Sequence, residues 1–214
     1  MKKTVSKNIS GLMFIASFAL VMTSCQKEQN PGIESNLIDA QVNNLSDANA
    51  MPSVSTCGTL PDTLKVPEGN KFVLQTFARG FQIYEVQRSA TDPNVFAWVN
   101  IAPLADLYAT PDFKDLLIHH FAGPTWEFLK GPFKGEKVVA TKVSGVTPDV
   151  TAIQWLLLKA DPTRSSADNQ ITFVQRICTA HGLAPTTGND EAHLGQKDSI
   201  PYTASYLFYT KNDL

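Results

Sequence analysis

From Thr59 onward, short apolar or alternating runs are separated by glycine, proline and small polar residues. In the run Ile171–Cys178, Phe173 and Ile177 fall on one face of an extended chain and Arg176 falls on the other. This period of two is typical of β-strands. The same texture predicts strands over Phe72–Phe77, Phe81–Arg88, Phe96–Ile101, Leu116–Phe121, Trp126–Leu129, Lys137–Val143, Ile153–Lys159, Ile171–Cys178 and Tyr202–Tyr209.

Helical periodicity is confined to a turn or two near Ala102–Tyr108 and Asp112–Leu117. Strands that follow one another without long helices pair in antiparallel fashion. We therefore expect an all-β fold: a single antiparallel β-sandwich or distorted barrel with minor short helices. The pattern leaves both architectures open.

The amino terminus has a different pattern. Lys2, Lys3 and Lys7 precede the uncharged apolar run Gly11–Met22, and the small residues Thr23-Ser24 follow it. This order predicts a secretory signal peptide over residues 1–24. The apolar run has 12 residues, whereas a membrane-spanning helix needs roughly 20. A membrane anchor helix or a buried core helix is the alternative reading.

The sequence Met22-Thr23-Ser24-Cys25 resembles the lipobox of bacterial lipoproteins, in a form similar to variants of the Bacteroidetes. The resemblance implies that Cys25 is acylated, becomes the first mature residue and attaches the protein to a membrane through its lipid. No Asp follows Cys25 in the stretch Gln26–Gln29, so the inner-membrane retention signal of enteric bacteria is missing. We expect a cell-envelope lipoprotein of the outer membrane that faces either the periplasm or the surface.

Residues 25–58 are rich in Asn, Gln, Ser, Asp and Ala and predict a polar tether, so the β-rich globular domain covers residues 59–214. Without residues 1–24 the chain has 15 Lys+Arg against 20 Asp+Glu, a formal net charge of −5. A mildly acidic chain without clusters of Lys or Arg is a poor ligand for a phosphate backbone. Nucleic acid is therefore not an expected partner.

Two cysteines besides Cys25 remain in the mature chain, Cys57 and Cys178. In an oxidising compartment two such cysteines often form a disulfide. A Cys57–Cys178 bridge would join the start of the domain to a late strand. Two separately buried thiols are the alternative.

Several phrases occur in an order that resembles one known family. They are Val66–Asn70 (VPEGN), Gly80–Tyr84 (GFQIY), His120–Glu127 (HFAGPTWE), Ala152–Ala160 (AIQWLLLKA), Phe173–Arg176 (FVQR), Gly182–Pro185 (GLAP) and Pro201–Ala204 (PYTA). The chain is similar over about residues 65–210 to secreted proteins of bacteria and fungi grouped as domain of unknown function 3455. The resemblance implies no activity. Many relatives have a cysteine after the Ala-Pro phrase, where this chain reads Gly188-Asn189-Asp190, so no family disulfide pattern transfers.

The stretch His119–Glu127 contains the densest group of side chains that could take part in chemistry. If Ala122–Thr125 forms a four-residue hairpin loop, His120 opposes Glu127, and cross-strand partners have Cβ atoms about 5 Å apart. An imidazole and a carboxylate at that spacing can act as a general base with its orienting group, or as two ligands of a metal. A structural pair at a tight turn explains the same residues.

Aromatic residues supply a second set of candidates. Trp126, Tyr84 and Tyr202, with Trp98 and Trp155, could form a platform for sugars or other flat ligands. Aromatic side chains at strand positions also fill cores, because each buries 150–250 Å². Both readings stay open.

Arg176 lies among apolar residues, and we expect it to pair with an acid such as Glu85 or Glu127, or to join His120 and Glu127 in a catalytic group. There is no G-x-S-x-G, H-E-x-x-H or G-x-G-x-x-G motif. We therefore predict neither a cofactor nor a metal. The sequence favours a non-enzymatic module that binds a small molecule, glycan or protein. An enzyme that uses His120, Glu127 and Arg176, hydrolase-like or metal-assisted, is one alternative, and a purely structural envelope protein is the other.

Overall fold

The computed structural model describes residues 57–212. The predicted signal peptide, Cys25 with its expected acylation, and most of the expected polar tether lie outside the described residues. None of the helices within 57–212 has the length and apolar character needed to span a membrane.

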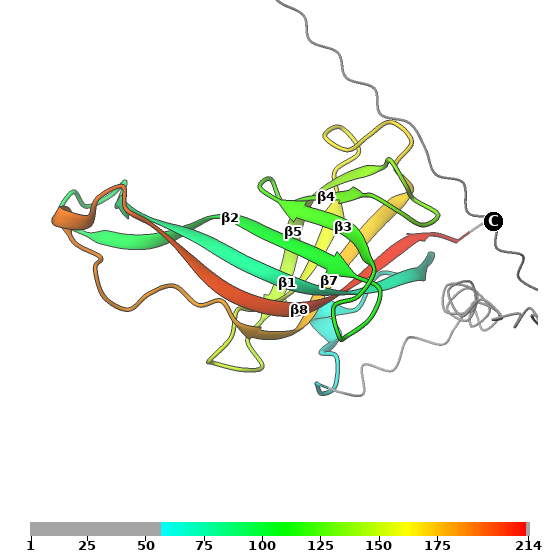
Figure 1. Cartoon of the computed structure of the whole chain (residues 1–214), viewed down its shortest axis with the longest axis horizontal. Coiled ribbons are helices and arrows are strands. Elements are labelled where there is room, and N and C mark those ends of the chain that lie inside the picture. The colour runs from blue at the N-terminus through cyan, green and yellow to red at the C-terminus, as the bar shows by residue number, and fades with distance from the viewer. Residues whose placement is uncertain (1–56, 213–214) are drawn as a thin grey trace, which may run out of the picture. The chain divides into compact units, whose positions relative to one another are not determined.

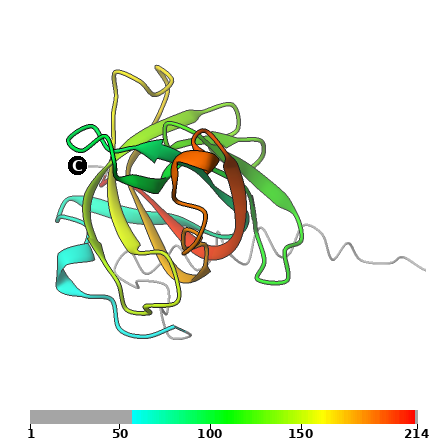
Figure 2. The ribbon, with the colours of Figure 1, turned by 90° about the vertical axis from the view of Figure 1, so that its left-hand side faces the viewer.

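The domain is built from eight antiparallel strands joined edge to edge into a ring (Figure 1, Figure 2). Neighbours in sequence are neighbours in the sheet, and the last strand pairs with the first. The strands range from 4 to 19 residues, so the barrel is uneven. The expected all-β fold is confirmed, in its distorted-barrel form. The strands are β1 (Asn70–Arg88), β2 (Phe96–Tyr108), β3 (Leu116–Phe121), β4 (Thr125–Phe128), β5 (Lys137–Val146), β6 (Trp155–Ala160), β7 (Ile171–His181) and β8 (Lys197–Lys211).

The two helical turns expected from the sequence are wrong in position. Residues 102–108 belong to β2, with Ala105 and Leu107 buried on alternate positions. In the second stretch, Phe113 and Asp115 have positive φ angles of 58° and 57°, which a right-handed helix does not allow. Short helices do occur elsewhere, as the 3-10 turns η2 (Asp62–Leu64) and η3 (Glu191–His193).

Strand β1 is continuous where the sequence predicts two strands separated near Gly80. This glycine lies opposite Ala105 of β2 and Tyr202 of β8. A Cβ atom at Gly80 would lie 2.3 Å from the carbonyl oxygen of Leu104 and 2.5 Å from the Cβ of Ala105. The glycine therefore marks a close approach of two backbones rather than the end of a strand.

Alternate side chains of the long strands fill the inside of the ring. On β8 these are Tyr202, Ala204, Tyr206 and Phe208, each at most 5% exposed. The ring of Phe208 meets that of Phe128 edge-on at 5.2 Å between centroids. This interior core does not fill the whole barrel, and a cavity remains beside it.

A second core covers the outside of β6, β7 and β8, which explains why both faces of these strands are apolar. The segment 57–66 lies across them and buries Leu64 against Trp155 and Leu207. In Figure 2 this segment, drawn in cyan, lies outside the ring of strands. We call residues 57–66 the strap.

Two kinds of contact fasten the strap. A disulfide joins Cys57 to Cys178 of β7, with Cα atoms 5.3 Å apart. Gln175, which is fully buried, donates a hydrogen bond of 2.6 Å to the carbonyl oxygen of Leu64 and accepts one of 2.6 Å from the Tyr209 hydroxyl.

Candidate functional site

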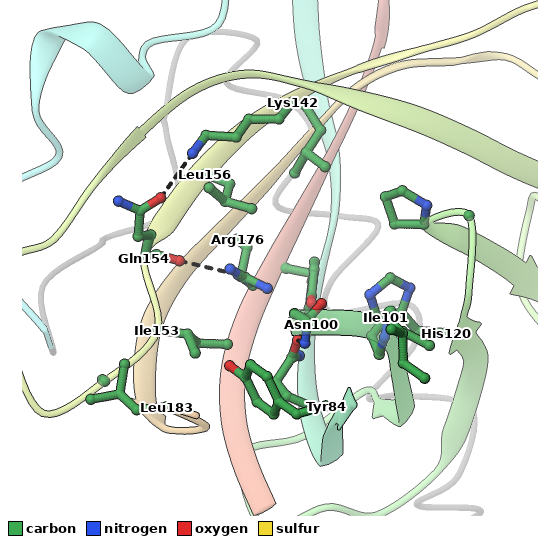
Figure 3. Close-up of a pocket in the computed structure, with 18 of the residues that line it drawn as sticks. Tyr84, Asn100, Ile101, His120, Lys142, Ile153, Gln154, Leu156, Arg176 and Leu183 are labelled. Atoms are coloured by element: carbon green, nitrogen blue, oxygen red, sulfur yellow. Dashed lines mark hydrogen bonds between the residues drawn. The ribbon is translucent and has the colours of Figure 1, made fainter. Parts of the chain in front are cut away.

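An open cavity of about 740 Å³ lies inside the barrel (Figure 3). Each of the eight strands contributes to its wall, together with the loop between β5 and β6. Its main apolar lining residues are Ile101, Ala102, Ile153, Leu156, Leu158 and Leu183. Its polar and charged lining includes Gln82, Asn100, His120, Lys142, Gln154 and Arg176. A cavity of this size with a few converging polar groups is typical of a small-molecule site.

Three aromatic rings form one wall of this cavity. The rings of His120 and Trp126 are stacked, with centroids 4.4 Å apart and an angle of 8° between their planes. The ring of Tyr206 meets both of them edge-on, at 5.3 and 5.8 Å. All three residues are at most 2% exposed, so their rings are packed against one another and the core.

The stacking of His120 on Trp126 follows from the length of the β3–β4 turn. Phe121 pairs with Thr125, so the loop has three residues, 122–124, and His120 pairs with Trp126. Gly123 takes a positive φ of 119° in this loop, a geometry that a three-residue turn needs. The predicted four-residue loop, and with it the pairing of His120 with Glu127, is wrong by one residue.

A shift of one residue moves a side chain to the other face of a sheet. Glu127 pairs with His119 instead, does not line the cavity, and its carboxylate lies 3.6 Å from the Nζ of Lys137. His119 contacts Asp106 at 2.7 Å. The expected group of His120, Glu127 and Arg176 is therefore not formed, because Glu127 lies on the opposite face from the other two.

His120 is held as a neutral imidazole. Its Nδ1 lies 2.8 Å from the backbone oxygen of Thr125, and because a carbonyl only accepts, Nδ1 carries the proton. Burial lowers the pKa of His120 to about 3; the positive charge of Arg176 also lowers this pKa, and the hydrogen bond to Thr125 opposes the shift. At neutral pH the Nε2 atom is therefore an uncharged acceptor and too weak a base for proton abstraction.

Arg176 points into the cavity from β7 (Figure 3). Its Nε donates a 3.1 Å hydrogen bond to the backbone oxygen of Gln154. The side chain of Gln154 accepts a 2.8 Å hydrogen bond from the Nζ of Lys142. The expected partners Glu85 and Glu127 pair with lysines instead, and within residues 57–212 no ion pair involves Arg176.

The positive charge of Arg176 influences the pKa of the tyrosines around the cavity. Burial raises the pKa of Tyr206, and the guanidinium of Arg176 partly opposes that rise through its charge and a contact with the hydroxyl. Burial also raises the pKa of Tyr84, and Arg176 again opposes the rise. The hydroxyl of Tyr84 donates a 2.7 Å hydrogen bond to the carbonyl oxygen of Gly182. Both tyrosines are therefore neutral hydrogen-bonding groups at physiological pH.

Two buried nitrogen atoms in the cavity wall lack a hydrogen-bond partner among the described residues. They are the Nε1 of Trp126 and the Nε2 of Gln82, whose Oε1 accepts from Asn100 at 2.9 Å. The Gln82 amide does lie close enough to the Tyr202 hydroxyl to influence its pKa. The Nε1 of Trp126 has no acceptor among the described residues, and a buried donor without an acceptor is rare in folded proteins.

The remaining sequence candidates are spread over the barrel. Tyr84 and Trp126 line the cavity, whereas Tyr202 borders a separate hollow of about 470 Å³. Trp155 belongs to the core under the strap, and Trp98 donates a 2.7 Å hydrogen bond to the backbone oxygen of Thr187. The five aromatic residues therefore do not form one platform.

Sequence reasoning missed four polar residues that line the cavity, Gln82, Asn100, Lys142 and Gln154. Gln82 is 4% exposed and occupies the same face of β1 as Tyr84. A polar residue at an inward position of a strand is the signal that could have identified it. No group of three or more His, Cys, Asp or Glu side chains that could hold a metal ion occurs in the described part of the chain.

Comparison with models of protein families gives a match over most of the described chain. A family model with the description "Protein of unknown function (DUF3455)" matches residues 67–210, which form the barrel from the start of β1 almost to the end of β8. No curated protein and no solved structure matches the chain.

Proposed function

Since this chain belongs to the family of proteins of unknown function DUF3455, we propose that its barrel is a non-enzymatic binding module that takes a small organic molecule into its cavity. The observation that supports this proposal is the cavity of about 740 Å³, with its wall of His120, Trp126 and Tyr206. A concave space of this size inside a barrel suits a small molecule better than a protein surface.

The chemistry of the wall favours binding over catalysis. His120 has no carboxylate to orient it, and burial keeps its pKa far below neutral. The lining offers no serine, cysteine, aspartate or glutamate among the described residues. What the wall does offer is a stacked aromatic face, hydrogen-bond donors and a guanidinium group, which bind and orient a ligand.

The place of action that we propose is the cell envelope, with the domain attached to the outer membrane through lipid on Cys25. The support is the order of charged, apolar and small residues before that cysteine. The disulfide between Cys57 and Cys178 also suits an oxidising compartment. In this arrangement the barrel captures its ligand outside the cytoplasm while the lipid holds it near the membrane.

The test is the binding of a neutral apolar fluorophore, N-phenyl-1-naphthylamine, to the purified mature domain. We expect saturable binding that Leu156→Trp abolishes, because Leu156 lines the cavity and a larger side chain there fills it. Val143→Trp is the matched control, since Val143 is 56% exposed and does not line the cavity. Equal binding by the two variants would place the ligand elsewhere and refute the proposal.

A further inference from the structure

The charge of the cavity is opposite to the charge of the chain. The whole sequence carries a formal net charge of −2, yet the cavity is lined by two cations, Lys142 and Arg176, and by no acidic residue. Arg176 is partly buried, whereas Lys142 is exposed to solvent. Placing a cation such as Arg176 in a partly buried site costs free energy unless an opposite charge accompanies it. Because no acidic side chain of the described residues pairs with Arg176, an anionic ligand could supply the missing opposite charge.

A single residue, Gln154, contacts both cations. Gln154 accepts from Arg176 with its backbone oxygen and from Lys142 with its side-chain oxygen (Figure 3). Each cation uses one of its N–H donors in its hydrogen bond to Gln154. A guanidinium has five N–H donors in a fork that matches a carboxylate or sulfate, so the outer nitrogens of Arg176 keep donors for a ligand.

A second observation points to an acceptor-bearing ligand. The indole Nε1 of Trp126 is buried, belongs to a residue of the cavity wall and has no acceptor among the described residues. The apolar side chains of Ile153, Leu156 and Leu158 line the same cavity. The site therefore combines donors and positive charge with aliphatic surface.

We propose that the ligand is a small amphipathic anion, whose carboxylate or sulfate group is bound by Arg176 with Lys142 close by, and whose apolar body lies against Leu156 and Leu158. This inference rests on the proposed function and names the chemical class of its ligand. A neutral ligand leaves the guanidinium without a counter-charge, and a cationic ligand meets two like charges.

The experiment is isothermal titration of the mature domain with three compounds that share a ten-carbon chain: decanoate, 1-decanol and decyltrimethylammonium. We expect decanoate to bind at least about tenfold more tightly than decanol, because hydrogen bonds to a charged partner are the stronger class. Decyltrimethylammonium should bind more weakly than decanol.

The variant Arg176→Gln should raise the Kd of decanoate by about 10- to 100-fold and leave that of decanol unchanged. Arg176→Lys keeps the charge and should restore part of the affinity, which also covers the case in which Arg176→Gln fails to fold. Lys159→Gln is the charge-matched control, because Lys159 is exposed on β6 and does not line the cavity.

The outcomes separate the two proposals. Equal affinity for decanoate and decanol, or an unchanged Kd for decanoate in Arg176→Gln, would overturn the anionic ligand and leave the binding cavity standing. Failure of all three compounds and of the neutral fluorophore to bind would overturn both. Decanoate affinity that falls equally in Lys159→Gln would show unspecific attraction and would also overturn the inference.

Discussion

Between pH 7.5 and pH 4.5, acid should destabilise this protein mainly through the buried residue His120. The imidazole is 2% exposed, and burial lowers its pKa to about 3, whereas a histidine in an unfolded chain titrates near 6.5. Between about pH 3 and pH 6.5 the imidazole is protonated in the unfolded state but neutral in the folded state. Stability from this residue is therefore fully present above pH 6.5 and is lost as the pH falls toward 3.

The size of the effect follows from the same two values. Each pH unit of this window changes the free energy of unfolding by at most about 1.4 kcal/mol. Between pH 7.5 and pH 4.5 the contribution of His120 should therefore fall by roughly 2–3 kcal/mol, a large share of the stability of a typical domain. The charge of Arg176 contributes to this lowered pKa, because it disfavours a second cation beside it.

The assay is urea unfolding at pH 7.5, 6.0 and 4.5 of the unmodified domain and of His120→Gln, whose amide can still donate to the Thr125 oxygen. The variant should be less stable at pH 7.5 but lose about 2–3 kcal/mol less on acidification. His119→Gln is the matched control, since His119 is the neighbouring residue and its side chain is 45% exposed. Parallel losses in the unmodified protein and in His120→Gln would refute the buried neutral imidazole.

Three further predictions concern the strap, the close approach of β1 and β2 at Gly80, and the lipid on Cys25. Replacing both Cys57 and Cys178 by Ala should lower the free energy of unfolding by about 2–5 kcal/mol, measured by urea titration, because the bridge closes a chain separation of 121 residues; equal stability of the two forms would contradict the role of the bridge. Gly80→Ala should lower the free energy of unfolding by about 1–3 kcal/mol and with it the melting temperature, since its Cβ would lie 2.3 Å from a backbone oxygen. The exposed change Lys134→Ala is the control. Cys25→Ala should abolish acylation and release the protein from membranes in a fractionation experiment, and an unmodified Cys25 peptide from membranes of the unaltered strain would contradict the lipid anchor.

The sequence predicted the strands well where one face alone is apolar. It failed at Gly80 because a glycine that permits close contact of two strands looks in a sequence like a glycine that ends a strand. It also predicted a helical turn in Ala102–Tyr108, where the spacing of apolar residues fits either period. Neither error changes the fold class, which the whole series of strands determines.

The site was less predictable because it depends on the register of one turn. A loop of three residues rather than four exchanges the partners of His120 and moves Glu127 to the outer face. The strap adds a second difficulty. It buries the outer face of β6–β8, so both faces of β7 are apolar, and the sequence alone does not show that Arg176 points inward. Alternation along a strand separates two faces but does not say which of them lines a cavity.

The indole signals of the three tryptophans offer the most direct test of the binding cavity. Trp126 lines the cavity, whereas Trp155 lies under the strap and Trp98 contacts Thr187. In a 1H–15N spectrum recorded during titration with decanoate, the Nε1–H signal of Trp126 should shift in a saturable manner while the other two stay in place. A shift confined to Trp98 or Trp155, or three unmoved signals at saturating decanoate, would contradict the account.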